Sequence, residues 1–220
     1  MVLVQVSQIL ARIPDGTTRI SLLGRHSLSV QDGPNETRTL SADGIQLCNE
    51  VSGFYTQLVH ELEVLTSSSE AAFYCSDMAR SFATIQEIFH PDSIYQDDRL
   101  NLLASLKKID GGAWFKEQKD AGCSEREIIS NFIVLTDPSV GADQPFELNA
   151  RNYLHWAAEP SGPRLRVAFA HEVACTMAAY PYFFFGEQWP GLKECESYMF
   201  CMNDWGHILR MIKVTPPATQ

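Results

Sequence analysis

The chain has 220 residues, of which 45% are hydrophobic and 20% are charged, and its formal net charge at pH 7 is −10. This length allows one domain with a full core, and the composition is that of an ordinary soluble globular protein. The acidic balance argues against a broad nucleic-acid surface and against an anionic membrane surface, so we expect neither as a partner.

The N-terminus and the cysteines both favour a cytoplasmic protein. Residues 1–10 lack the basic segment and the long apolar core of a secretion signal, and no apolar run reaches the roughly 18 residues of a membrane span. The six cysteines form no CxxC pair and no spacing typical of a metal site. We therefore expect buried free thiols and no bound metal.

The first elements lead to a pair of polar residues. Residues 1–13 are apolar without a clear period, so they predict either a short strand or a short helix at the edge of the fold. The apolar run 20–23 indicates a buried strand that ends at Gly24 and is followed directly by Arg25 and His26. Ligands of open α/β sheets bind beyond the carboxyl ends of the strands, which is where this pair falls.

A helix and a second strand-to-helix unit come next. Ser41 can cap a helix that runs to about residue 65, because apolar residues recur there at helical spacing. Residues 71–75 predict a strand, and Ser76 or Asp77 would cap the helix that follows. Arg80 then falls in the first turn of that helix, close to the end of the strand.

The second half of the chain predicts helices, one confident strand and a hairpin. Residues 91–162 are interpreted as a largely helical insertion over the active site, with a possible short strand at 93–95 and helices at 100–109, 124–135 and 146–158. A strand at 164–170 ends at His171 and Glu172, and a helix at 173–180 follows it. Two alternating runs, 194–202 and 207–214, indicate a β-hairpin at the sheet edge.

These elements predict an α/β three-layer sandwich in a single domain over residues 1–220, with a mostly parallel central sheet flanked by helices. The two histidines at strand ends are the candidate chemical groups. Imidazole near a guanidinium can present a free nitrogen at neutral pH, and arginine matches phosphate oxygens, so Arg25 and His26 together suggest attack on phosphorus. Taken alone, an Arg-His dipeptide is more often an ordinary surface pair.

Three motifs in chain order carry a resemblance to a known family. LLGRHS, FYCSDMARSFATIQEI and VAFAHEVACTMA, each at a strand end, resemble the histidine phosphatase superfamily, which has the phosphoglycerate mutase-like fold. The matching positions are Arg25, His26, Ser76, Arg80, Thr84 and His171. The resemblance implies a metal-independent and cofactor-independent phosphomonoester hydrolase that forms a phosphohistidine at His26. Its substrate would be a small phosphorylated metabolite or a phosphoprotein.

The resemblance also implies roles for the other site residues. Arg25, Arg80 and a protonated His171 would bind the phosphoryl oxygens. Apart from the resemblance, we expect Ser27 and Arg38 as further substrate contacts: Arg38, in the flanking loop, could steer an anionic substrate, and a solvated surface charge is the alternative for it. Ser27-Leu28 stands where the family commonly has Gly-Glu, which makes a mutase less expected. Glu172 is the favoured proton donor, and an acid within 97–117 is the alternative (Asp97, Asp98, Asp110 or Glu117). A weakly active or inactive relative that binds a phosphorylated or protein partner is the other function that stays open.

Overall fold

The computed structural model describes residues 2–30, 37–101, 117–123, 145–179 and 191–217. Its elements, in chain order, are α1 (Val2–Leu10), β1 (Arg19–Arg25), α2 (Ala42–Thr66), β2 (Ala72–Cys75), α3 (Ala79–Phe89), β3 (Ile94–Gln96), the 3₁₀ helix η2 (Asp98–Leu100), α6 (Pro145–Ala158), β4 (Leu165–Ala170), α7 (Glu172–Ala179), β5 (Ser197–Met202) and β6 (Ile208–Val214).

The six strands form one sheet in the order β3-β2-β4-β1-β5-β6. Neighbours from β3 to β1 are parallel, whereas β5 runs antiparallel to both β1 and β6. Phe169 of β4 is in register with Gly24 of β1 on one side and with Cys75 of β2 on the other. The carboxyl ends of β1, β2 and β4 therefore coincide, and this register brings the residues that follow them to one edge of the sheet.

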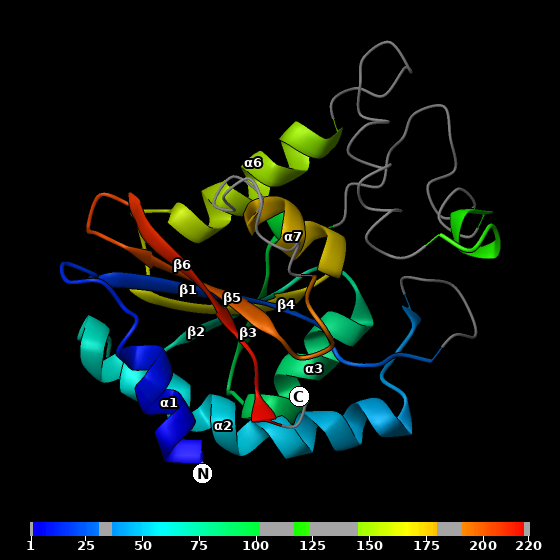
Figure 1. Cartoon of the computed structure of the whole chain (residues 1–220), viewed down its shortest axis with the longest axis horizontal. Helices are drawn as coiled ribbons and strands as arrows, with labels where there is room; N and C mark the ends of the chain where they lie inside the picture. Colours follow the sequence, from blue (N-terminus) through cyan, green and yellow to red (C-terminus); the bar gives the residue numbers. More distant parts are fainter. Residues whose placement is uncertain (1, 31–36, 102–116, 124–144, 180–190, 218–220) are drawn as a thin grey trace.

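Helices cover both faces of this sheet (Figure 1). α1, α2 and α3 lie on one face, and α6 and α7 lie on the other. β4 supplies both cores: Val167 and Phe169 pack on the α2 and α3 side, while Ala168 and Ala170 pack on the α6 and α7 side. A strand buried on both faces is largely apolar, and β4 is apolar apart from Arg166. The expected three-layer α/β sandwich is confirmed.

Most of the predicted elements are present, with some differences. Residues 1–13, for which the sequence predicts either a strand or a helix, contain the helix α1. The hairpin is confirmed, with β6 at the sheet edge. From the range 91–162, β3 belongs to the sheet and α6 to a helical layer, so these two elements are parts of the sandwich. The helix expected at 124–135, and most of the one expected at 100–109, fall outside the described residues.

Of the two predicted helix caps, the one at α2 is confirmed and the one at α3 is wrong. Ser41 caps α2, because its Oγ accepts from the Gly44 backbone N–H at 3.1 Å. The prediction for α3 is wrong: its N-cap is Met78, which has no side-chain cap. The hydroxyl of Ser76 instead donates to Ser81 at 2.9 Å, so it is occupied within the site.

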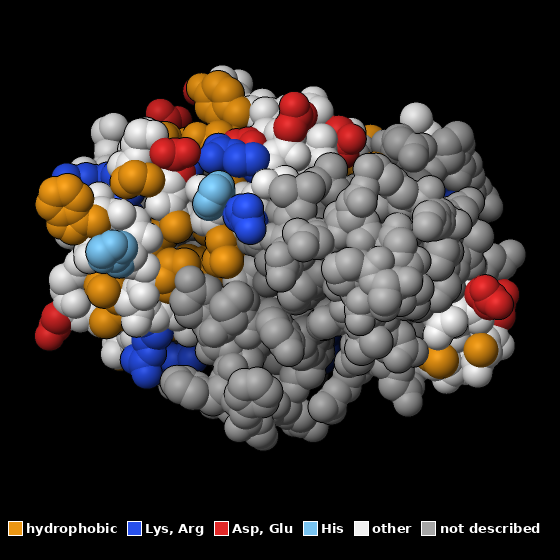
Figure 2. Space-filling model, turned by 90° about the horizontal axis from the view of Figure 1, so that it is seen from above, with side chains coloured by type: hydrophobic (Ala, Val, Ile, Leu, Met, Phe, Trp, Pro, Cys, Tyr) orange, Lys and Arg blue, Asp and Glu red, His pale blue; other side chains and the backbone are white. Residues whose placement is uncertain are grey.

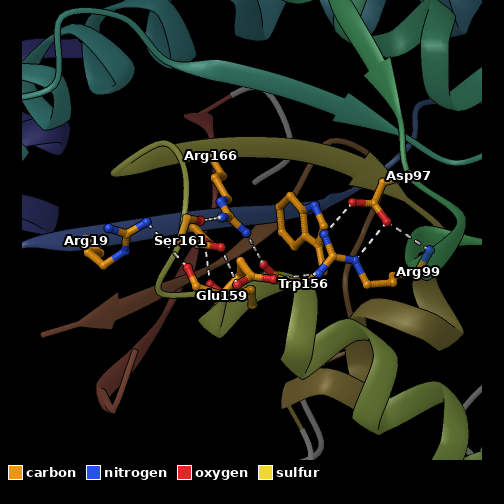
Figure 3. A network of polar contacts seen from close by, with 9 residues as sticks. Arg19, Asp97, Arg99, Trp156, Glu159, Ser161 and Arg166 are labelled. Atoms are coloured by element: carbon orange, nitrogen blue, oxygen red, sulfur yellow. Dashed lines mark hydrogen bonds and ion pairs between the residues drawn. The ribbon is translucent and has the colours of Figure 1, made fainter. Parts of the chain in front are cut away.

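Two buried arginines fasten the end of α6 to the sheet (Figure 3). Arg166 of β4 donates to the carbonyl of Trp156 at 2.7 Å and to that of Ser161. Arg19 of β1 donates to the carbonyls of Gly162 and Pro163 at 2.9 and 3.0 Å. Carbonyls at a helix C-terminus lack intrahelical partners, and Arg166 satisfies that of Trp156. The other three carbonyls belong to the segment between α6 and β4, which the two cations hold against the sheet.

The surface and the thiols agree with a globular domain. Seen from the α6 and α7 side, acidic, basic and hydrophobic side chains are interspersed over the described part of the surface (Figure 2). All six cysteines are free thiols, and all but Cys123 are buried.

None of the helices in the described ranges combines the length and apolar character that a membrane crossing requires.

The start of α2 packs tightly on the loop that follows His26, and this gives a stability prediction. A Cβ at Gly44 would lie 2.1 Å from the backbone oxygen of Leu28, whereas one at Gly53, in the same helix, would have nothing within 4 Å. We expect Gly44→Ala to lower the free energy of unfolding by about 2 kcal/mol or more, because backbone has to move. Gly53→Ala should raise it by about 0.5–1 kcal/mol through helix propensity. Urea denaturation of both variants checks this, and equal effects would contradict it.

Candidate active site

His26 lies directly after β1 with its ring held from two sides. Its backbone N–H donates to the Ala170 carbonyl at 2.9 Å, which ties it to the end of β4. Its Nδ1 lies 2.7 Å from the carbonyl of Ser27. Since a carbonyl can only accept, Nδ1 carries the ring proton. Nε2 is then the acceptor, and it receives Nε–H of Arg80 at 2.9 Å.

The same surroundings keep His26 neutral. Burial lowers the pKa of His26 to about 4, with smaller contributions from the charges of Arg80 and Arg25, against the opposing effect of the Ser27 carbonyl. An imidazole with this pKa is unprotonated at neutral pH, as a nucleophile has to be.

His171 follows β4 and faces His26. The two ring centroids lie 5.3 Å apart in an edge-on arrangement. Nε2 of His171 lies 3.2 Å from Oγ of Ser76, and Nδ1 lies 3.4 Å from Nη2 of Arg80. Burial, followed by the neighbouring His26 and Arg80, holds the pKa of His171 well below its usual value.

Arg80 joins the two imidazoles. It lies in the first turn of α3, is 6% exposed, and directs its guanidinium at both rings. The hydroxyl of Thr84 donates to the Arg80 carbonyl at 2.8 Å and accepts the backbone N–H of Ser27 at 3.0 Å. The loop after β1 and the start of α3 are therefore fixed to each other, and His26, Arg80 and His171 are brought together.

Arg25 lies beside this group but is held by carboxylates. Its Nη1 lies 2.8 Å from Glu172 and its Nη2 lies 2.9 Å from Glu194. Nη1 also donates to the Leu192 carbonyl at 2.7 Å. Two acidic side chains therefore bind this guanidinium, and its contact with a phosphoryl group stays a prediction.

Glu172 is the first residue of α7 and adjoins His171, as its position in the sequence required. Its Oε2 forms the ion pair with Arg25. Its Oε1 packs against Gly191, so closely that a Cβ at that position would lie only 3.1 Å away. Glu194 was not identified from the sequence. It comes shortly before β5, whose first residue pairs with Gly24, so only the antiparallel pairing of β5 with β1 indicates that it reaches Arg25.

The two further substrate contacts expected from the sequence differ in outcome. Ser27 is fully buried, and its hydroxyl donates to the Gly44 carbonyl at 2.8 Å. This corrects the expected role, because that bond directs the side chain into the packing under α2. Arg38 lies partly buried in the segment that leads into α2. Its contact with substrate stays a prediction.

The four acids that the sequence offers as alternative proton donors differ in their surroundings. Asp97 accepts Nε and Nη2 of Arg99 at 2.9 and 2.6 Å, and Arg99 also reaches Glu159 at 3.2 Å (Figure 3). Burial raises the pKa of Asp97, but the bonds from Arg99 outweigh it and lower the pKa. Asp97 is thus an ionised partner of Arg99. Asp98 begins η2, Asp110 falls outside the described residues, and Glu117 is exposed.

A metal centre has no support from the part of the chain that the structure describes. Within those residues, no group of three or more histidine, cysteine, aspartate or glutamate side chains is placed to hold an ion. The cationic groups around His26 suit an oxyanion, and a phosphoryl group is the class of ligand that such an arrangement binds.

The sheet order and the flanking helices define a phosphoglycerate mutase-like α/β fold, and the two histidines follow neighbouring strands of its sheet. The fold that the motif resemblance implied is therefore confirmed. The chain is similar to a phosphoglycerate mutase from Bacillus anthracis, with 15% identity over 93% of this chain and 96% of that one and a TM-score of 0.56.

Two further solved structures have the same fold. A candidate alpha-ribazole-5'-P phosphatase from Escherichia coli K-12 has 13% identity over 91% of this chain and 97% of that one, with a TM-score of 0.52. YhfR of Bacillus stearothermophilus has 16% identity over 86% and 95%, with a TM-score of 0.51. No protein-family model matches the sequence, and no curated protein is significantly similar to it.

Proposed function

We propose that the protein is a phosphomonoester hydrolase that works through a phosphohistidine at His26. One observation carries this proposal: a neutral His26 offers Nε2 as an acceptor, 2.9 Å from Nε of Arg80 and beside a second buried imidazole. Phosphate oxygens accept charge-assisted hydrogen bonds strongly, so a phosphoryl group would take over the N–H groups of Arg80. That exchange frees the Nε2 lone pair next to phosphorus.

The reaction then has two displacements. Nε2 of His26 attacks phosphorus in line, the bond to the ester oxygen breaks, and the leaving oxygen takes a proton. Water next attacks the phosphohistidine and releases inorganic phosphate. Arg80 and a protonated His171 stabilise the charge on the equatorial oxygens in both transition states. The substrate is a small phosphorylated metabolite or a phosphoprotein.

A pH–rate profile with p-nitrophenyl phosphate tests this function. Because the pKa of His26 lies at about 4, the nucleophile is ready throughout pH 5–8. We expect turnover in that range, with the loss that comes from His26 protonation beginning only near pH 4. Absence of turnover from pH 4 to 8 would reject the hydrolase.

That outcome would favour the second candidate, a protein that binds a phosphorylated partner without hydrolysing it. The observation behind this alternative is the ion pairing of Arg25 with two carboxylates, Glu172 and Glu194, which occupies a cation of the site. Binding of inorganic phosphate without turnover would distinguish the binder from a hydrolase.

We propose Glu172 as the proton donor, because it adjoins His171 and is held beside the site by Arg25 at 2.8 Å; it has to leave this ion pair and take up a proton before it can protonate the leaving oxygen. We expect Glu172→Gln to slow hydrolysis of an alkyl phosphate at least about tenfold more than hydrolysis of p-nitrophenyl phosphate, since only the poor leaving group needs the proton. Glu194→Gln is the matched control, as it removes the other carboxylate bound to Arg25. Equal effects of Glu172→Gln on both esters would remove it from this role, and a selective effect of Glu194→Gln would transfer the role to Glu194.

A further inference from the structure

We propose that Ser76, with Ser81 behind it, is a positioning residue that fixes the tautomer of His171 and provides the acceptor that its protonated form needs. The proposal rests on the proposed function, in which His171 donates to a phosphoryl group. It gives a role to the buried hydroxyls of Ser76 and Ser81, which take no part in the two displacements of the proposed reaction.

The hydroxyls form a directed chain to His171. Oγ of Ser76 donates to Oγ of Ser81 at 2.9 Å and lies 3.2 Å from Nε2 of His171. A hydroxyl has a single hydrogen, so once Ser76 donates to Ser81 its oxygen can only accept from the imidazole. Nε2 of His171 therefore carries a proton. Both serines are at most 2% exposed, so the surrounding protein is what satisfies these groups.

The other side of the ring indicates the same tautomer independently. Nδ1 of His171 lies 3.4 Å from Nη2 of Arg80, which can only donate. Nδ1 is therefore the unprotonated nitrogen at rest, and it is the one on the side of Arg80. The two contacts together turn the acceptor nitrogen of His171 toward the cation that would bind the phosphoryl group.

This arrangement matters when a phosphoryl oxygen arrives. The negative charge favours addition of a proton to Nδ1, taken from solvent or from a protonated oxygen of the ligand, and the imidazolium then has two N–H groups. Nδ1–H donates to the phosphoryl oxygen, and Nε2–H still has Ser76 as its acceptor. Without Ser76, a buried charged donor would have no partner, and such a donor is costly.

The experiment follows the tautomer of His171 and the binding of inorganic phosphate in the full-length protein at pH 7. 15N chemical shifts of histidine-labelled protein report the tautomer, and calorimetry reports the affinity. In the wild type we expect the Nε2–H form. Ser76→Ala should mix in the Nδ1–H form and weaken phosphate binding about tenfold, as expected when one charged donor loses its acceptor.

Two more variants sharpen the test. Ser81→Ala leaves Ser76 in place but frees its hydrogen, so we expect a smaller weakening, about threefold, with partial loss of the Nε2–H form. If Ser76→Ala does not fold, this variant decides. Ser21→Ala is the matched control, because Ser21 is a buried serine of β1 whose hydroxyl donates to the Ala157 carbonyl at 2.7 Å. It should leave both readouts unchanged.

The outcomes separate this inference from the proposed function. Wild-type tautomer and affinity within twofold in the serine variants would overturn it, and so would an equal loss in Ser21→Ala. If the wild type binds phosphate but hydrolyses no ester, the hydrolase fails while the tautomer shift in Ser76→Ala still supports the positioning role. If the wild type does not bind phosphate, the tautomer measurement alone decides.

Discussion

We expect His26→Ala to lower hydrolysis of p-nitrophenyl phosphate to the buffer background, a loss of at least about 10³-fold. The reason is that Nε2 of His26 is the atom that bonds to phosphorus in the proposed reaction, and alanine offers no replacement. The measurement is steady-state turnover, together with acid-labile, base-stable labelling by a radioactive phosphate ester. The label should appear on the wild type and be absent from the variant.

A histidine away from the site controls for general effects of the substitution. His60 lies exposed on α2, and His60→Ala should keep full turnover. Turnover in His26→Ala within tenfold of the wild type would remove His26 as the nucleophile, and labelling that persisted in it would place the phosphoryl group on another residue.

We expect Arg80→Lys to lower kcat/KM by about 10²–10³-fold even though it keeps the positive charge. One planar guanidinium reaches Nε2 of His26 at 2.9 Å and Nδ1 of His171 at 3.4 Å, and a lysine ammonium cannot span both rings in that geometry. The variant should therefore lose the alignment of the two imidazoles and the paired donors for the phosphoryl oxygens. Steady-state kinetics measure the effect, and a thermal melt confirms folding.

Arg164→Lys is the matched control for this change. Arg164 lies just before β4, at the other end of the strand from His171, with its side chain 47% exposed. It should leave kcat/KM unchanged. A loss in Arg80→Lys of less than about threefold would show that charge alone is enough, and the geometric argument for Arg80 would then be wrong.

The meeting of His26, Arg80 and His171 could be predicted because it depends on regular structure. Each residue follows a strand that is recognisable from its apolar run, and parallel strands end at the same edge of a sheet. Once β1, β2 and β4 are neighbours, the three residues converge without any detail of side-chain packing.

The surroundings of Arg25 could not be predicted in the same way. Its partner Glu194 comes from a segment whose position depends on how β5 pairs with β1, and no local pattern encodes that pairing. The role of Ser27 was missed for a related reason, since its hydroxyl donates to Gly44 only because α2 approaches the loop so closely. Contacts of these kinds depend on tertiary packing, which overrides what the neighbouring sequence suggests.

The place of β1 in the sheet has a consequence for biosynthesis. The first strand to be made is flanked by β4 and β5, whose residues come at least 140 positions later, as the pairing of Ile20 with Leu165 illustrates. A ribosome-bound chain made only as far as β2 holds His26 with neither neighbour of its strand available. Long-range pairing of this type forms slowly and late. The emerging polypeptide therefore acquires its reactive imidazole long before it acquires the groups that align it.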